Sequence, residues 1–98
     1  MGKIIDTTES VILEKVAIII DILMIILNCS YSEAYSIITK SKMYYSLQER
    51  DYGTLHDSPQ ANLSSIGVEL RQKNNLLGNR ITDENIKKAM LSMIERNS

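Results

Sequence analysis

The stretch TESVILEKVAIIIDILMIILN, residues 8–28, is the most hydrophobic part of the chain and decides the fold. Within residues 11–27, fourteen of the seventeen side chains are apolar. The stretch therefore predicts one long helix, with Thr8 or Ser10 as its N-cap and Glu9 in the first turn, where the helix dipole favours an acid. The polar residues recur at helical spacing in one narrow stripe, made by Ser10, Glu14, Asp21 and Asn28.

A membrane span is the first alternative for this stretch. Glu14, Lys15 and Asp21 interrupt it, and its longest unbroken apolar run is the six residues 22–27. A span needs about 20 predominantly apolar residues, and a central Asp costs about 2.5–3.5 kcal/mol on insertion. We therefore expect no span and no membrane partner. No targeting signal is visible, and the single cysteine, Cys29, suits a reducing cytoplasm.

A helix that is apolar around most of its circumference is either the centre of a bundle or half of an interface. A chain of 98 residues has few other helices that could cover it. We therefore expect a homodimer with this helix at the seam, and we leave open a monomer in which it is the central core helix. The candidate interface residues are Val11, Ile18, Ile19, Ile22, Ile25 and Ile26.

Local start signals predict further helices after the first. Ser30, with Glu33 three residues later, has the form of a capping box. Ser58 followed by Pro59 is a favoured helix start, because proline lacks the donor that would be unpaired there, and this helix should run to about Lys73.

Weaker signals complete the pattern. Ser41 is expected to cap a short helix, and Thr82 to cap the last one. Between them, Gly78 or Asn79 is expected to take the left-handed conformation that ends a helix. The apolar stripe of the last helix would be Ile86, Ala89, Met90, Met93 and Ile94.

The expected fold class is all-α, a compact bundle of four to five helices around the very hydrophobic first helix. The chain has only one proline and four glycines, which is few for the many turns that a many-stranded fold requires. The bundle should form a single domain over residues 1–98, with disordered ends at residues 1–6 and 97–98.

The stretch SLQERDYGTLHDSP, residues 46–59, contains the only histidine and the only proline. Histidine acts as a general acid or base near neutral pH, and a carboxylate can orient it, so His56 has the best catalytic neighbours in the chain. We interpret the stretch instead as a connection in which Tyr52 and Leu55 enter the core and the following residues turn into the next helix. The neighbours are Asp51, Tyr52 and Asp57.

The rest of the chain offers little chemistry. One histidine and one cysteine cannot build a zinc cluster within one chain, and no phosphate-binding or dinucleotide fingerprint is present. Cys29 follows the end of an apolar helix, where a buried and inert thiol is the usual outcome. We therefore expect no enzyme, no catalytic residue, no metal site and no cofactor.

Nucleic-acid binding is the alternative from another functional class. The net charge of −1 gives no global attraction to nucleic acid, but residues 71–88 hold five basic and two acidic side chains. Residues 32–48 also have the form of two helices around a short turn, as a helix-turn-helix requires. A solvated charged face is the structural explanation of the same residues. The candidate patch consists of Lys40, Lys42, Arg71, Lys73, Arg80, Lys87 and Lys88.

The stretches SEAYSIITKS and DYGTLHDSPQANLSSIGVEL resemble a family of short uncharacterised helical proteins of low-G+C Gram-positive bacteria. The resemblance covers roughly residues 11–72, and residues 76–96 depart from it by adding a helix that members usually lack. Members are often encoded beside ADP-ribosyltransferase-like or other toxin-like proteins, so the resemblance implies an antitoxin-like or accessory role with a co-encoded partner. It brings no catalytic residues. The matching positions are Ser32, Ala34, Tyr35, Tyr52, Leu55, His56 and Ser58.

Together these patterns predict a small, non-catalytic, cytoplasmic protein-interaction module that is homodimeric and antitoxin-like. The alternative is a DNA-binding transcriptional regulator, and an enzyme that uses His56 is a distant third.

Overall fold

The computed structural model describes residues 7–96, and this part of the chain is all-α, as the sequence predicts: 83% of it is helical and it contains no strand. The expected loose ends, residues 1–6 and 97–98, lie outside the described residues. Within residues 7–96, six α-helices and one short 3-10 helix follow one another along the chain. They are α1 (Thr7–Leu27), α2 (Tyr31–Thr39), α3 (Lys42–Gln48), α4 (Tyr52–His56), α5 (Pro59–Gln72), η1 (Leu76–Arg80) and α6 (Asp83–Arg96).

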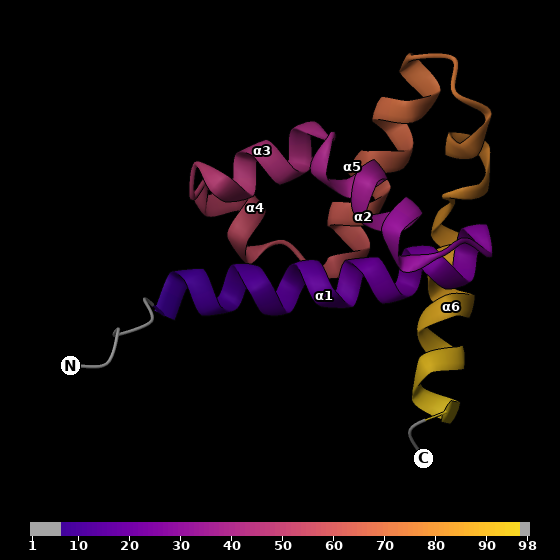
Figure 1. The fold of residues 1–98 in the computed structure, drawn as a ribbon, viewed down its shortest axis with the longest axis horizontal. Helices are drawn as coiled ribbons and strands as arrows, with labels where there is room; N and C mark the ends of the chain where they lie inside the picture. The colour runs from indigo at the N-terminus through magenta and orange to yellow at the C-terminus, as the bar shows by residue number, and fades with distance from the viewer. Residues whose placement is uncertain (1–6, 97–98) are drawn as a thin grey trace.

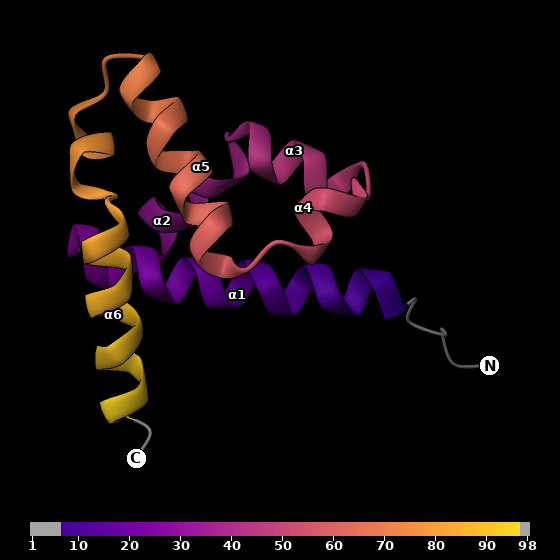
Figure 2. The same cartoon turned by 180° about the vertical axis from the view of Figure 1, so that it is seen from behind.

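The long first helix is the base on which the other helices pack (Figure 1). Helices α2 to α5 lie on one side of α1, and both views show this arrangement (Figures 1 and 2). Helix α5 leads away from α1, η1 lies alongside α5, and α6 returns across the C-terminal part of α1. The second half of α6 continues beyond α1, on the side opposite to α2–α5.

The core is built of branched aliphatic side chains, and α1 supplies more of them than any other helix. Of the large aliphatic side chains that are fully buried, α1 contributes four, α5 two, and α2, α3 and α6 one each, while one more lies between η1 and α6. Complete burial of one such side chain stabilises the fold by about 1.5–3 kcal/mol, so α1 is the largest single contributor. The fully buried aliphatic residues are Ile19, Ile20, Ile22, Leu23, Ile38, Leu47, Leu63, Ile66, Ile81 and Ile86.

Most helix starts lie where the local signals predict. The capping box of Ser30 and Glu33 is present, and Ser41 and Ser58 cap α3 and α5. Thr82 Oγ1 accepts a hydrogen bond from a backbone N–H three residues later, at 3.1 Å, as expected of a cap. Thus these starts are determined by residues within one helical turn.

The start of α1 and the left-handed residue after α5 differ from the predictions. Helix α1 begins at Thr7, so Thr8 and Ser10 lie inside it and do not cap it. After α5, the left-handed residue is Asn74, with φ 58°, instead of Gly78 or Asn79, which both belong to η1. Helix α5 itself ends at Gln72, close to the predicted end at about Lys73, and residues 76–80 form the 3-10 helix η1.

Gly78 and Gly67 have a packing role instead. A Cβ atom on Gly67 would lie 2.7 Å from the carbonyl oxygen of Ile81, and one on Gly78 would lie 2.8 Å from the backbone nitrogen of Arg71. The two glycines therefore allow η1 to lie directly against the backbone of α5. Arg71 closes this contact by donating from Nη1 to the carbonyl oxygens of Gly78, at 2.6 Å, and Ile81, at 3.2 Å.

None of the helices within residues 7–96 combines the length and the hydropathy that a bilayer crossing requires. The charged residues that interrupt α1 account for this, as the sequence indicates.

Candidate functional site

One face of α1 is left uncovered by the rest of the chain. We call it the α1 outer face and define it by six exposed residues: Val11, Leu13, Glu14, Ala17, Ile18 and Asp21. Four of the six are apolar, and Leu13 is 62% exposed. Because α2–α5 lie on the opposite side of α1, this face is on the side toward which α6 projects (Figures 1 and 2).

The predicted interface residues divide into three groups by exposure. Val11 and Ile18 are exposed and belong to the α1 outer face, whereas Ile25 and Ile26 are half-buried. The other two residues, Ile19 and Ile22, are completely buried in the core of the chain itself. The interface prediction is corrected for Ile19 and Ile22, because a folded chain cannot offer them to a partner.

The second half of α6 carries another uncovered apolar face. Lys87, Leu91 and Ile94 follow one another at i, i+4 and i+7, so they share one face, which we call the α6 free face. Leu91 is 54% exposed and Ile94 is 64% exposed. The expected stripe of α6 is only partly core: Ile86 and Ala89 are buried, and Met90 and Met93 are half-buried. Leu91 was not predicted to be exposed at a surface of this kind, because nothing in the local sequence shows that α6 extends beyond α1.

A buried lysine holds the connection between α4 and α5 onto α1. Lys15 is only 8% exposed. Its Nζ donates to the carbonyl oxygen of Asp57, to that of Thr54 at 3.3 Å, and to Oδ1 of the buried Asn62 at 3.0 Å. Burial lowers the pKa of Lys15, and the nearby Asp57 carboxylate offsets part of this effect. From the sequence, Lys15 was expected only to interrupt the apolar run. Its structural role could not be predicted, because its hydrogen-bond partners are about 40 residues away along the chain.

The histidine stretch forms a connection, with a single-turn helix inside it. The rings of Tyr52 and His56 pack against each other with centroids 4.1 Å apart. Tyr52 is 75% exposed, which corrects the expectation that it enters the core, whereas Leu55 is half-buried.

The carboxylate of Asp51 caps α4 and does not orient His56. Its Oδ2 accepts from the backbone N–H of Thr54 at 3.0 Å and from the Thr54 hydroxyl at 2.9 Å. These two hydrogen bonds lower the pKa of Asp51, because they favour the charged carboxylate.

The basic residues proposed for nucleic acid are distributed over several helices, and four of the seven make contacts within the chain. Arg71 binds backbone oxygens of η1, and Arg80 Nη2 donates to the carbonyl oxygen of Ile26 at 3.1 Å. Lys73 pairs with Glu69 at 3.7 Å, and Lys88 pairs with Glu84 at 3.2 Å. The exposed Lys40 and Lys42 lie at the turn between α2 and α3.

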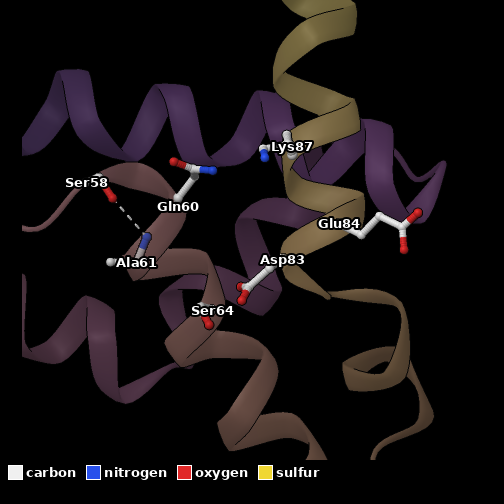
Figure 3. A pocket seen from close by; sticks show the side chains of 7 residues that line it. All are labelled: Ser58, Gln60, Ala61, Ser64, Asp83, Glu84 and Lys87. Atoms are coloured by element: carbon white, nitrogen blue, oxygen red, sulfur yellow. Dashed lines mark hydrogen bonds between the residues drawn. The ribbon is translucent and has the colours of Figure 1, made fainter.

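Lys87 lines an open cleft of about 630 Å³ between the starts of α5 and α6 (Figure 3). The same cleft carries two carboxylates, and Asp83 points toward Ser64 across it. An anion placed here would meet these carboxylates, so the cleft does not have the uniform charge of a phosphate-binding site. Its lining residues are Ser58, Gln60, Ala61, Ser64, Asp83, Glu84 and Lys87.

The remaining reactive groups are consistent with structural roles. Within residues 7–96, no three histidine, cysteine or acidic side chains are grouped so that they could hold a metal ion. Cys29 is half-buried, and burial raises the pKa of its thiol, which makes it a poor nucleophile at neutral pH.

Comparison of the chain with protein-family models, with curated proteins and with solved structures finds no match.

Proposed function

We propose that the protein is a small, non-catalytic interaction module that works as a homodimer. The observation that supports the proposal is the apolar surface left on two adjoining helices, the α1 outer face and the α6 free face. On α6 the two exposed apolar residues lie in the half of the helix that extends past the body of the molecule. Exposed apolar patches bordered by charged residues are typical of protein-binding sites.

The roles of the polar groups favour binding over catalysis. Lys15 is occupied in holding the α4–α5 connection, Asp51 caps a helix, and His56 packs on Tyr52. A catalytic base has to face a site where substrate can reach it, and these groups are used for the chain's own structure. The single cysteine, Cys29, further supports a cytoplasmic location.

The test is the mass of the protein in solution, measured by light scattering over a range of concentrations. The dimer would have twice the 11.1 kDa mass of the chain. Leu91→Asp combined with Ile94→Asp should raise the dissociation constant at least about tenfold, because each apolar side chain contributes about 1.5–3 kcal/mol when fully buried.

The matched control is Leu76→Asp. Leu76 is 79% exposed, more than Leu91, but it lies on η1 and away from both faces. It should leave the dissociation constant unchanged. A wild-type protein that stays monomeric at all concentrations would refute the homodimer.

An antitoxin-like role, which the resemblance implies, would use the same surface for a different protein. Co-purification of the chain with the product of a neighbouring gene, lost in the Leu91→Asp, Ile94→Asp variant, would identify that role. The DNA-binding alternative gains little support, because four of the seven candidate residues, Arg71, Lys73, Arg80 and Lys88, make contacts within the chain and the seven are distributed over several helices.

A further inference from the structure

We propose that residues 51–57, which we call the α4 strap, open and close locally on the folded chain, and that Lys15 is the latch that holds them closed. The proposal describes a conformational device and does not depend on the homodimer. In the closed state the strap lies over the N-terminal half of α1 (Figures 1 and 2). When it opens, the part of α1 beneath it reaches solvent while the other helices stay packed.

The strap has little structure of its own that would keep it in place. Helix α4 is five residues long and contains no buried side chain, although that of Leu55 is half-buried. An isolated helix needs about 12–15 residues to be even marginally stable in water. Several contacts of the strap are internal: Asp51 Oδ2 binds the N–H of Thr54, and the ring of Tyr52 lies on that of His56. These contacts do not attach the strap to the helices beneath it.

Lys15 joins the strap to α1 through hydrogen bonds. Its Nζ donates to the carbonyl oxygen of Asp57 and, at 3.3 Å, to that of Thr54. Both oxygens lie toward the C-terminal end of α4, where carbonyl groups lack partners within the helix and a lysine can bind them. Asn62 Oδ1, on α5, accepts a third hydrogen bond from Nζ at 3.0 Å and so holds the ammonium group under the strap. One side chain thus connects the strap to both α1 and α5.

The helices on either side of the strap are held without it. Helix α3 is tied to α5 by Glu69, whose two carboxylate oxygens accept from the N–H of Lys42 at 3.0 and 3.2 Å, and its Leu47 is fully buried. Helix α5 begins at its own cap, in which Ser58 Oγ accepts from the N–H of Ala61 at 3.1 Å. Opening of the strap breaks none of these contacts, so it is a local event within a folded chain.

Opening changes the surface that α1 presents. Ile12 lies three residues before Lys15, on the same side of α1, and is 8% exposed with the strap closed. The elements over this end of α1 are α3, α4 and the α4–α5 connection, as both views show (Figures 1 and 2). Once the strap has opened, Ile12 and the ammonium group of Lys15 add to the exposed surface of α1. The strap therefore determines how much of α1 is accessible to a partner.

Amide hydrogen exchange of the full chain, followed residue by residue by NMR, tests the opening. The N–H groups of Leu55 and Asp57 are hydrogen-bonded within the strap. After correction for intrinsic rates, they should exchange at least about a hundredfold faster than those of Ile20 and Leu23 in the middle of α1. Their rates should change little in low urea, because local opening exposes little surface. Equal protection of the strap and α1 amides, with equal urea dependence, would overturn the local opening.

Lys15→Met tests the latch, because methionine keeps the apolar stem of the side chain and removes its donors. The amides of Leu55 and Asp57 should exchange roughly five- to thirtyfold faster than in wild type, since two hydrogen bonds that close the strap are lost. Unchanged rates at these two amides would show that Lys15 does not hold the strap.

Gly67→Ala is the matched control, because it destabilises the fold away from the strap. Its new Cβ would lie 2.7 Å from the carbonyl oxygen of Ile81, at the contact between α5 and η1. The α1 amides should exchange faster in this variant, while the strap amides should keep their wild-type rates, because strap opening does not disturb that contact. If the strap amides speed up as much as the α1 amides, the strap opens only when the whole chain unfolds, and the proposal is wrong.

Discussion

Replacing Lys15 removes three hydrogen bonds that join α1 to the α4–α5 connection. Lys15→Met keeps most of the side-chain length and packing but loses the donors to Thr54, Asp57 and Asn62. Among these acceptors, Asn62 Oδ1 belongs to a residue that is 2% exposed, so water cannot easily replace the lysine there. The carbonyl oxygens of Thr54 and Asp57 lie nearer the surface and can be rehydrated.

The expected cost follows from these positions. An unsatisfied buried acceptor costs about 1–3 kcal/mol, and hydrogen bonds to a charged group contribute about 1.5–3 kcal/mol each. Burying the ammonium group costs free energy, as the lowered pKa of Lys15 indicates. The variant avoids this cost, which offsets part of the lost stability. We therefore expect Lys15→Met to lower the free energy of unfolding by about 2 kcal/mol. Lys15→Ala should cost about 4 kcal/mol, because a cavity is added.

Urea unfolding followed by circular dichroism measures these values. The control for this pair is the double variant Lys15→Met, Asn62→Leu. It removes both the donor and the acceptor of the buried hydrogen bond, so neither remains unsatisfied. The double variant should be less destabilised than the sum of the two single variants, by about 1–2 kcal/mol. A Lys15→Met protein within about 0.5 kcal/mol of wild type would refute the reasoning, as would strict additivity.

The same lysine gives a pH dependence. Because the pKa of Lys15 is lowered on folding, the unfolded chain binds the proton more tightly than the folded chain does. The free energy of unfolding should therefore rise with pH between the lowered folded pKa and the ordinary lysine pKa of about 10.4. The free energy of unfolding is measured against pH for wild type and for Lys15→Met. The difference between the two profiles isolates the contribution of Lys15 from those of the tyrosines and Cys29. A difference that falls with pH over this window would contradict the direction of the shift.

Two further outcomes follow from features of the fold. Gly67→Ala and Gly78→Ala should each destabilise the protein by about 1–3 kcal/mol in the same unfolding assay, because the new Cβ would press on backbone atoms less than 3 Å away. Gly53→Ala, where the nearest atom is 3.4 Å away on a side chain, is the control and should be neutral or slightly stabilising. Duplex DNA should give no salt-sensitive gel shift at low salt; a shift abolished by Arg71→Glu with Lys73→Glu would favour the DNA-binding alternative.

The sequence predicted the helices well wherever a start is encoded within one turn. Ser30, Ser41 and Ser58 each bond to a backbone N–H three residues away, so the signal and its partner lie in the same short stretch. The length of α1 followed from its apolar run. The polar stripe that contains Glu14 and Asp21 does lie on its exposed side. The apolar residues beside the stripe are too uniform, however, to tell the buried Ile19 from the exposed Ile18.

The features missed from the sequence depend on contacts between distant segments. Nothing near Lys15 shows that Asn62 will meet it, and nothing near Leu91 shows that α6 runs past α1. The exposed position of Tyr52 follows from the short α4, which buries no side chain completely. The exposed face of α1 lies on a helix that the apolar run predicts, whereas the exposed face of α6 follows only from the packing of the helices.

The local caps also determine how the chain should reach this fold. The capping hydrogen bonds join residues three apart, so they can form within the time of helix formation, about 0.1–1 μs, before any tertiary contact exists. The bonds of Lys15 to Asn62 and of Arg80 to Ile26 span 47 and 54 residues, and each requires a long loop to close first. Refolding should therefore be fast, as in other helical proteins, with the closing of α5 and α6 onto α1 as its slowest step.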